Sequence, residues 1–228
     1  MKILSIIIPI YNEEKTLKEL LNRVISLKTK LKKEIIAIDD GSRDNSYSIL
    51  KKFKNIKLIS HRFNRGKGAA VRTGLTHSTG DIILIQDADL EYPPEQIPKL
   101  LAPILNNQAD VVYGSRFLRK ENENWKIFCH YLGNRLISFF AGLLYGKNLT
   151  DIETCYKIFT KKVKDSLNLE LDDFGFEVEF FSQICAKNYR IVEMPIEYKP
   201  RVWAEGKKIS WRDGVKAIWY LLRMKFGE

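Results

Sequence analysis

Residues 81–91 read DIILIQDADLE, in which three acids directly follow a run of apolar residues. Asp87, Asp89 and Glu91 stand at alternate positions, and alternate side chains of an extended chain point the same way. We therefore expect two or three carboxylates to converge at the end of a buried strand, with a positive group between them because like charges repel. Oxygen ligands of this kind favour Mg²⁺ or Mn²⁺, with substrate phosphates completing the shell. The alternative is a solvated acidic turn that caps the following helix.

The first half of the chain alternates short apolar runs with longer amphipathic segments. The apolar runs predict strands at residues 3–10, 34–40, 56–60, 81–86 and 109–115. The amphipathic segments predict helices at residues 13–29, 43–53, 66–77 and 94–106. This alternation indicates an α/β, Rossmann-like fold with a mostly parallel sheet and helices on both faces. Ligands of such sheets collect at the carboxyl ends of the strands.

The second half of the chain is less regular. Residues 117–150 are aromatic and basic, and we predict helices at about 125–145, 176–187 and 210–225, a strand within 190–198 and a basic loop at 199–208. No internal repeat or linker marks a second unit. We therefore predict one catalytic domain at residues 1–208, followed by a C-terminal amphipathic helix at 209–228, and no independent second domain.

The composition is that of a packed protein that attracts anions. Of 228 residues, 45% are apolar and 29% are charged, and the formal net charge is +10. This balance suits nucleotides, phosphorylated substrates, nucleic acid or an anionic membrane, and does not choose among them. Cys129, Cys155 and Cys185 are odd in number and far apart. That spacing argues against a disulfide framework or a structural zinc site, and it favours a reducing compartment.

No segment predicts export or a membrane span. The start, MKILSIIIPIYNEE, has a short apolar run followed at once by acids and lacks a cleavage site, so we expect a buried strand there. The longest other apolar stretch, residues 136–145, is shorter than the roughly 18 residues that span a bilayer. A cytoplasmic protein is expected.

Three further motifs lie at the ends of predicted strands. PIYNEE ends the first strand and IDDGSRDNS ends the second, which brings Tyr11, Glu13, Asp39 and Asp40 to the carboxyl edge of the sheet. An aromatic wall and acceptors for base and ribose hydrogens are what a nucleoside needs. NRGKGAAVRTG, after the third strand, has glycines and Lys67 that could cradle a phosphate at a helix N-terminus. A plain turn is the alternative for this last motif.

The motifs of the chain, taken in order, resemble those of one family. They are IIIPIYNEE, IDDGSRDNS, NRGKGAAVRTG, GDIILIQDADLEYPPEQIPKLL, VVYGSRF, DIETCYKIF and MPIEYKPR. This series resembles the family 2 inverting glycosyltransferases, and within them the dolichyl-phosphate mannose synthase-like branch that acts on polyprenyl phosphates. The resemblance covers about residues 2–208. It implies a GT-A fold, a nucleotide-diphosphate sugar as donor, and Mg²⁺ or Mn²⁺ as cofactor.

The resemblance also implies which residues bind the donor. The nucleoside pocket is expected at Pro9, Tyr11, Glu13, Ile38 and Asp40, with Asp39 beside them. Asp87 and Ala88 would lie against ribose and diphosphate, and Asp89 and Glu91 would hold the metal. Arg116 and Arg201 match arginines that grip phosphates, and Lys207 and Lys208 fit a basic loop that closes over the donor. We expect Asp89, Arg116 and Arg201 to carry the transfer step.

Two positions depart from the pattern of the family. Glu91 stands where many relatives have glutamine, which keeps an oxygen ligand but adds a negative charge. Gly175 and Phe176 stand where some mannose synthases carry a lysine. The donor is therefore left open between the GDP-mannose and UDP-glucose types.

The acceptor depends on what the nucleophile needs. A phosphate monoester, whose second pKa is about 6, needs cations to hold it and no base. Arg116 and Arg135 are the candidates to bind a polyprenyl phosphate, with Arg119 and His130 in the same aromatic segment. A sugar hydroxyl of a glycan or glycolipid is the alternative, and it needs a base. Acidic candidates for that base exist in Glu153, Glu177 and Glu179, of which Glu177 or Glu179 could act, although acids at such spacing more often form a solvated helix face or hold a nearby arginine.

Two other classes fit the sequence less well. A nucleotidyltransferase shares the fold type, but the chain has no N-terminal GxGxR-like loop. Nucleic-acid binding through the positive charge is disfavoured, because the basic residues are dispersed and carboxylates crowd the edge where phosphates would bind. The sequence leaves the oligomeric state open.

The C-terminal segment has the pattern of an amphipathic helix. Its apolar stripe consists of Trp211, Val215, Ile218, Leu222 and Phe226, widened by Trp219, Tyr220 and Leu221. Its cations are Arg212, Lys216, Arg223 and Lys225. Such a helix suits the interface of an anionic membrane, together with the aromatic segment at 125–145. We expect a peripheral protein on the cytoplasmic face of the membrane, and the alternative is a helix that packs back on the catalytic domain.

Overall fold

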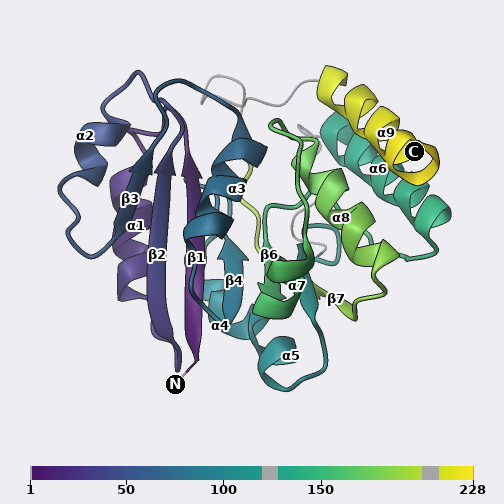
Figure 1. Ribbon diagram of the computed structural model, residues 1–228, viewed down its shortest axis with the longest axis horizontal. Helices are drawn as coiled ribbons and strands as arrows, with labels where there is room; N and C mark the ends of the chain where they lie inside the picture. Colours follow the sequence, from purple (N-terminus) through teal and green to yellow (C-terminus); the bar gives the residue numbers. More distant parts are fainter. Residues whose placement is uncertain (1, 120–127, 202–210, 228) are drawn as a thin grey trace.

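A seven-stranded sheet forms the centre of the molecule, in the order β3-β2-β1-β4-β6-β5-β7 (Figure 1). The computed structural model describes residues 2–119, 128–201 and 211–227. The strands are β1 Ile3–Ile10, β2 Lys32–Asp39, β3 Lys57–Ser60, β4 Ile82–Ile85, β5 Val111–Ser115, β6 Lys157–Thr160 and β7 Ile191–Pro195. The five strands predicted in the first half of the chain are all present, with ends that differ by at most two residues from the prediction.

Six of the strands run in one direction, so the predicted mostly parallel α/β sheet is confirmed. The exception is β6, which is antiparallel to both β4 and β5. It begins within the motif DIETCYKIF, where no strand was predicted, and ends one residue after it. Since Ile158 and Phe159 are fully buried, this short strand closes the core between the two parallel halves of the sheet.

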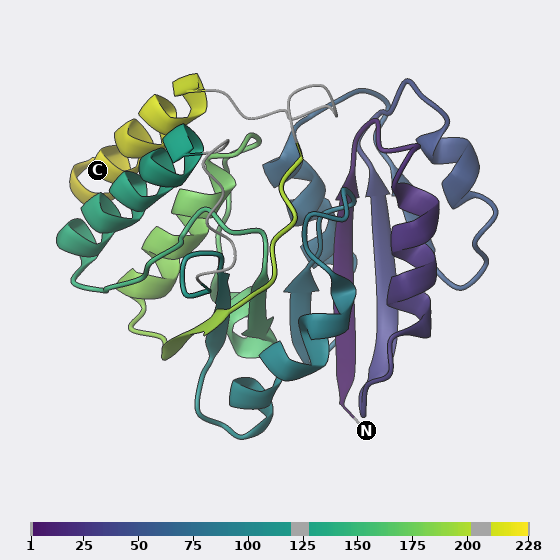
Figure 2. The ribbon, with the colours of Figure 1, turned by 180° about the vertical axis from the view of Figure 1, so that it is seen from behind.

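Helices cover both faces of the sheet. In Figure 1, α3, α7 and α8 lie in front of the strands, whereas Figure 2 shows α1 and the segment with α4 on the opposite face. These helices are α1 Leu17–Ser26, α2 Ser46–Leu50, α3 Lys67–His77, α7 Lys161–Ser166 and α8 Phe176–Ala186. The first helix is shorter than predicted, because residues 13–16 form a turn rather than a helical start.

The helix predicted at residues 94–106 is broken into three pieces. They are a 3₁₀ turn at Pro94–Gln96, α4 at Ile97–Leu100 and α5 at Ala102–Leu105. Pro98 and Pro103 each stand near the start of a piece. A proline has no N–H to donate and its ring clashes with the carbonyl four residues earlier, so an uninterrupted helix cannot run through both positions.

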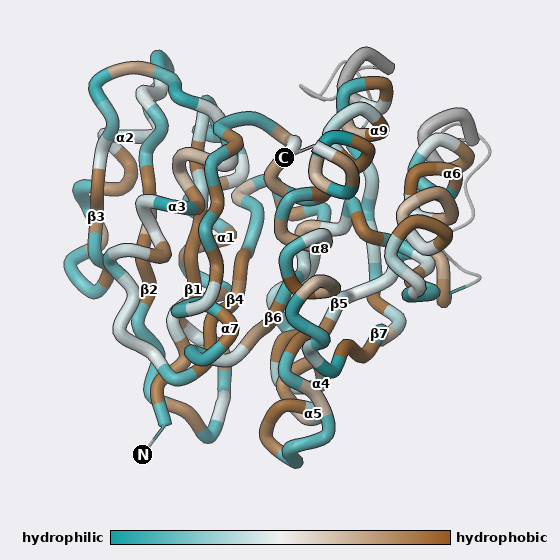
Figure 3. Tube along the Cα trace, turned by 45° about the vertical axis from the view of Figure 1, so that its right-hand side comes forward, coloured by the Kyte–Doolittle hydropathy of each residue, from teal (hydrophilic) through white to brown (hydrophobic). Residues whose placement is uncertain are grey.

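Two long helices, α6 Phe128–Tyr145 and α9 Trp211–Phe226, pack together beside α8 (Figure 1). Ala217 and Leu221 of α9 are buried, so this helix does pack back on the domain. Its other side remains open, and Figure 3 shows hydrophobic segments along both helices. The predicted boundary at residues 208–209 lies outside the described residues. Within the described ranges, no helix combines the length and the hydrophobicity that crossing a membrane requires.

Gly74 offers a test of how tightly α3 packs on the sheet. A Cβ at this position would lie 2.4 Å from Ile7 Cγ2 and 2.9 Å from Ile38 Cδ1. We expect Gly74→Val to lower the free energy of unfolding by about 1–3 kcal/mol, because the strands beneath would have to move. Urea denaturation measures this change.

Gly133 on α6 supplies the matched control. A Cβ there meets no atom within 4 Å, so Gly133→Ala should be neutral or stabilising by up to about 1 kcal/mol. A Gly74→Val protein as stable as the wild type would contradict the close contact between α3 and β1.

Candidate active site

The acids after β4 lie on a turn and not on an extended strand. β4 ends at Ile85 and the chain turns at residues 88–89. Leu90 has a left-handed backbone conformation, with φ of 62°. The backbone N–H of Glu91 donates to Asp89 Oδ1 at 3.1 Å. The extended geometry assumed from the sequence is therefore wrong, because the left-handed residue reverses the direction of the chain.

The three acids divide between two cations. Asp87 Oδ1 lies 3.1 Å from Lys67 Nζ. Asp89 Oδ2 lies 3.1 Å from Arg201 Nη2, and Glu91 Oε1 lies 3.9 Å from Arg201 Nε. Two of the three carboxylates thus meet one positive group while the first pairs with Lys67, and a turn rather than an extended strand brings them there.

Arg201 reaches this turn because its segment of chain runs beside it. The backbone N–H of Lys199 donates to the carbonyl of Glu91 at 2.9 Å, and the backbone N–H of Arg201 donates to the Glu91 carboxylate at 2.8 Å. Glu197 and Gln96 exchange two more hydrogen bonds. We call residues 197–201 the strap. Its backbone contacts position the arginine at the carboxyl edge of the sheet, where β1 and β4 end.

Glu13 completes the group around this guanidinium. Arg201 Nη1 donates to Glu13 Oε2 at 2.9 Å. Glu13, Asp89 and Glu91 therefore surround a single arginine, and their side chains are mostly buried. Burial, with the nearby charges of Asp87 and Glu91, raises the pKa of Asp89 to about 7, although Arg201 opposes the shift.

The residues at this edge fit a divalent cation. Asp89 and Glu91 present carboxylate oxygens, which hard cations prefer, and a positive group already lies between them. In the part of the chain that the structure describes, no cluster of three or more His, Cys, Asp or Glu is arranged as a metal site. Further ligands for a cation would therefore come from substrate oxygens or water, as is usual for Mg²⁺.

Lys67 lies in a chain of buried charges. Its Nζ is 3.1 Å from Asp87 and 3.0 Å from Glu177. Although burial opposes it, Asp87 and Glu177 raise the pKa of Lys67 well above its usual value. Lys157, fully buried, also bonds Glu177 and the carbonyl of Thr154. The lysine predicted to meet a phosphate is thus held by two carboxylates.

The acids considered as a base differ in their surroundings. Glu177 is held by two lysines, and Glu179 accepts the backbone N–H groups of Glu170 and Leu171 at 2.8 and 3.0 Å. Both are therefore engaged in structural contacts. Glu153 is different, because its Oε1 is buried without a hydrogen-bond partner, and burial followed by the charge of Glu177 raises its pKa to about 7. Of the three, Glu153 is best suited to take up a proton.

Asp40 accepts four hydrogen bonds from the loop after β3. His61 Nδ1 and the backbone N–H of Arg65 contact Oδ1 at 2.6 and 2.9 Å. Asn64 Nδ2 and the backbone N–H of Gly66 donate to Oδ2 at 2.9 and 2.8 Å. Both oxygens are therefore occupied in building the loop. The role of Asp40 in a nucleoside pocket stays a prediction.

One carboxylate oxygen of Asp39 can still accept a hydrogen bond. Its Oδ1 is buried with no hydrogen-bond partner, while Oδ2 accepts from Ser60 Oγ at 3.2 Å. Pro9 is paired in register with Ile38, one residue before Asp39, and Tyr11 follows at the same edge. The side chain of Ile38 is fully buried beneath α3, so it supports this edge from below. An unpartnered acceptor beside Pro9 and Tyr11 is suited to a base or ribose hydrogen.

Arg116 forms a buried pair that the sequence analysis did not predict. Its Nε and Nη2 donate to the two carboxylate oxygens of Asp151 at 2.7 and 2.6 Å. The guanidinium also lies over the ring of Tyr198, 5.3 Å from its centroid. Asp151 opens the motif DIETCYKIF, which was the available signal for it. The pair fixes the orientation of the arginine at the end of β5.

The remaining predicted residues lie apart or outside the described chain. Ala88 is buried, and its carbonyl accepts from Thr16 Oγ1 at 2.8 Å. Arg135 is exposed on α6. The described part of the chain does not include Lys207, Lys208 and Trp125, or the side chains of Phe128, His130, Tyr131, Trp211 and Arg212.

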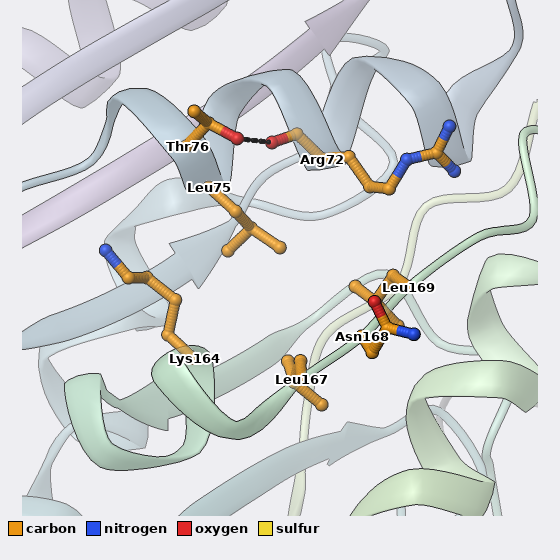
Figure 4. A pocket seen from close by; sticks show the side chains of 7 residues that line it. All are labelled: Arg72, Leu75, Thr76, Lys164, Leu167, Asn168 and Leu169. Atoms are coloured by element: carbon orange, nitrogen blue, oxygen red, sulfur yellow. Dashed lines mark hydrogen bonds between the residues drawn. The ribbon is translucent and has the colours of Figure 1, made fainter.

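A surface pocket of about 280 Å³ lies elsewhere, between α3 and residues 164–169 (Figure 4). It contains none of the predicted site residues. Its two cations are engaged, since Arg72 donates to the carbonyl of Leu171 and Lys164 to that of Ser78. The pocket offers no cluster of acids or unpaired cations comparable to the sheet edge.

Comparison with known proteins decides the family. The profile described as glycosyl transferase family 2 matches residues 5–167. The chain belongs to glycosyl transferase family 2. The prediction of a family 2 glycosyltransferase is therefore confirmed.

Curated relatives of this family 2 chain support the predicted branch. A UDP-N-acetylglucosamine–dolichyl-phosphate N-acetylglucosaminyltransferase of Methanococcus voltae is 32% identical, over 100% of this chain and 98% of that protein. A dolichol-phosphate mannosyltransferase of Pyrococcus furiosus is 31% identical, over 89% of this chain. The aligned region is 58% of the Pyrococcus protein, so this chain corresponds to little more than half of that relative.

Solved structures establish the GT-A fold of the family 2 chain. Glucosyl-3-phosphoglycerate synthase from Mycobacterium tuberculosis, in complex with Mn²⁺, UDP and glucosyl-3-phosphoglycerate, has a TM-score of 0.77 at 18% identity, covering 98% of this chain and 80% of that one. The same enzyme with Mg²⁺ and UDP has a TM-score of 0.76 at 19% identity, covering 98% and 79%. These neighbours bind a nucleotide diphosphate and a divalent cation.

Mutation of the two neighbouring aspartates should have different effects on stability and on nucleotide binding. We expect Asp40→Asn to lower the free energy of unfolding by about 2–4 kcal/mol, because its amide group would face hydrogen-bond donors. Asp39→Asn should change stability by less than about 1 kcal/mol and weaken binding of UDP or GDP by roughly tenfold. Urea denaturation and calorimetric titration give the two values. An Asp40→Asn protein of wild-type stability would contradict the structural role given to Asp40.

Proposed function

We propose that this glycosyltransferase moves a sugar, with inversion, from a nucleotide-diphosphate sugar to a polyprenyl phosphate. The observation that carries the proposal is the convergence of Glu13, Asp89 and Glu91 on Arg201 at the carboxyl edge of the sheet. Carboxylates and a guanidinium at one point are the groups that a metal diphosphate needs. The two dolichyl-phosphate transferases among the relatives support the choice of acceptor.

The donor would lie across the ends of β1, β2 and β4. Tyr11 and Pro9 would line the nucleoside, and the free oxygen of Asp39 would accept one of its hydrogens. Asp89 and Glu91 would hold Mg²⁺ or Mn²⁺, which supplies positive charge to the leaving diphosphate when bound. Arg201 would bind the same diphosphate, and Lys207, outside the described residues, remains a predicted partner.

The acceptor phosphate would lie near the end of β5. The paired Asp151 and the ring of Tyr198 keep the Arg116 guanidinium in one orientation, so little side-chain entropy is lost when an anion binds. Arg135 on α6 would add a second cation. A phosphate dianion attacks without a general base, which is consistent with the engaged state of Glu177 and Glu179.

A lipid acceptor requires the protein to reach a membrane surface. α6 and α9 together expose a set of apolar side chains that we call the outer stripe. Its members are Leu132, Leu136, Phe139, Leu143, Val215, Ile218, Trp219, Leu222 and Phe226. Four residues of the predicted apolar stripe of α9 are thus exposed, whereas Leu221 is buried, and Lys216, Arg223 and Lys225 on the same helix are exposed. Each such cation near an anionic surface contributes about 1 kcal/mol.

A second candidate function, transfer to a sugar hydroxyl, is favoured by one observation. Glu153 has an unpartnered buried oxygen and a pKa of about 7, which suits a general base. The two functions make different demands on this residue. A phosphate acceptor does not need Glu153, whereas a hydroxyl acceptor does.

Transfer assays test the proposed function directly. The protein is incubated with Mn²⁺, polyprenyl phosphate and a panel of GDP- and UDP-sugars, and glycolipid and released nucleotide diphosphate are both measured. We expect one donor to yield glycolipid, and Asp89→Asn to reduce donor and Mn²⁺ binding together by at least roughly tenfold. Full metal-dependent turnover by Asp89→Asn would contradict the metal site.

The same assay separates the two acceptors. Glu153→Gln should keep most of the activity toward polyprenyl phosphate, because that transfer needs no base. Loss of about a hundredfold or more in this variant, with a glycan hydroxyl as the better acceptor, would favour the second function.

Flotation with liposomes tests the outer stripe. Leu143 is 72% exposed on α6, and Leu105, 40% exposed on α5, is a matched leucine on another part of the surface. Binding should require anionic lipid and fall at high salt. Leu143→Asp should weaken recovery by roughly tenfold, and Leu105→Asp should not change it. Equal loss in both variants, or equal binding to neutral liposomes, would remove the stripe and its cations from the proposal.

A further inference from the structure

We propose that Arg201 is a built-in counterion that competes with the divalent cation for Asp89 and Glu91, and that the nucleotide diphosphate releases it. This inference rests on the metal site of the proposed function. It assigns to Arg201 a task before the reaction, in addition to gripping phosphates. The consequence is that metal and nucleotide should bind cooperatively.

The contacts of the guanidinium place it among the oxygens that a cation would take. Arg201 Nη2 lies 3.1 Å from Asp89 Oδ2, and Nε lies 3.9 Å from Glu91 Oε1. Glu13 holds Nη1 at 2.9 Å. A cation bound to Asp89 and Glu91 would therefore stand within a few ångströms of a like charge that shares its ligands, and the two would repel each other.

One nitrogen of the Arg201 guanidinium lacks a hydrogen-bond acceptor. Its Nε is buried without a hydrogen-bond partner, although the guanidinium carries three ion contacts. A buried donor that lacks a partner raises the energy of the state that contains it. Phosphate oxygens match the planar guanidinium bidentately. A diphosphate at this edge would thus give the arginine a better set of acceptors than the carboxylates do.

The strap links the two binding events through Glu91. The carboxylate of Glu91 accepts the backbone N–H of Arg201 at 2.8 Å, and its carbonyl accepts that of Lys199 at 2.9 Å. A cation held by Glu91 would compete for this carboxylate with the backbone N–H of Arg201 as well as with the guanidinium. A ligand that draws the guanidinium to its phosphates therefore frees both Asp89 and Glu91 for metal. By linkage, metal must raise nucleotide affinity by the same factor.

The charges around Arg201 predict whether its mutation raises or lowers the affinity for Mn²⁺. Glu13, Asp89 and Glu91 carry up to three negative charges around one positive charge. Removing the positive charge leaves the site more attractive to a free cation. Arg201→Gln should therefore bind Mn²⁺ more tightly than the wild type in the absence of nucleotide, while binding nucleotide diphosphate less well.

The experiment is a calorimetric titration of Mn²⁺ into the full chain, without nucleotide and with saturating UDP or GDP. The variants are Arg201→Gln and Arg201→Lys, and the control is Arg190→Gln. Arg190 pairs with Asp110 at the opposite end of the strands, so this control removes one positive charge away from the site. Thermal unfolding of each variant confirms that it is folded.

We expect Arg201→Gln to bind Mn²⁺ alone roughly tenfold more tightly than the wild type, and Arg190→Gln to bind it equally well. Arg201→Lys should fall between, because a lysine keeps the charge but not the planar fork that reaches several carboxylates. The enhancement of Mn²⁺ affinity by nucleotide should be smaller in Arg201→Gln than in the wild type.

Three outcomes would overturn the inference. Equal or weaker binding of Mn²⁺ alone by Arg201→Gln would show that Arg201 does not compete, and would leave the proposed metal site standing if the wild type binds Mn²⁺. An unchanged enhancement by nucleotide would remove the coupling. No binding of Mn²⁺ by any of the proteins, with or without nucleotide, would remove the metal site together with the inference.

Discussion

The interaction on which the site depends is the contact between Arg201 on the strap and the turn after β4. Backbone hydrogen bonds from Lys199 and Arg201 to Glu91 fix the strap along this turn. The guanidinium then lies among three carboxylates that would otherwise repel one another at a single edge. Since charges removed from water are costly unless paired, the turn and the strap stabilise each other.

Ion pairing recurs at two other predicted site residues. Lys67 is held by Asp87 and Glu177, and Arg116 by Asp151. A chain with a net charge of +10 therefore presents compensated cations where its substrates would bind. Under the proposed function, phosphates and a divalent cation would replace protein carboxylates and guanidinium groups as the partners of these charges. Such an exchange favours ordered binding, because each ligand changes the charge that the next one meets.

Much of the fold could be predicted because its signals are local. Buried parallel strands appear as apolar runs, and the glycine-rich and acidic motifs stand at their ends. The antiparallel β6 was missed because a strand of four residues carries too little periodicity. The helix at 94–106 was predicted as one piece, but Pro98 and Pro103 divide it. The apolar stripe of α9 was also predicted, although the pattern alone could not say which side packs and which stays exposed.

The sequence by itself determined the family, which motif follows each strand, and the presence of acids after β4. Only the tertiary structure decided which charge each residue meets. Asp39 and Asp40 are neighbours of one type, yet one keeps a free buried oxygen and the other accepts four hydrogen bonds. Arg201 meets Asp89 across more than a hundred residues. The physical reason is that pairing depends on distance and burial, which the chain sets only by folding, whereas periodicity and turn chemistry act between near neighbours in sequence.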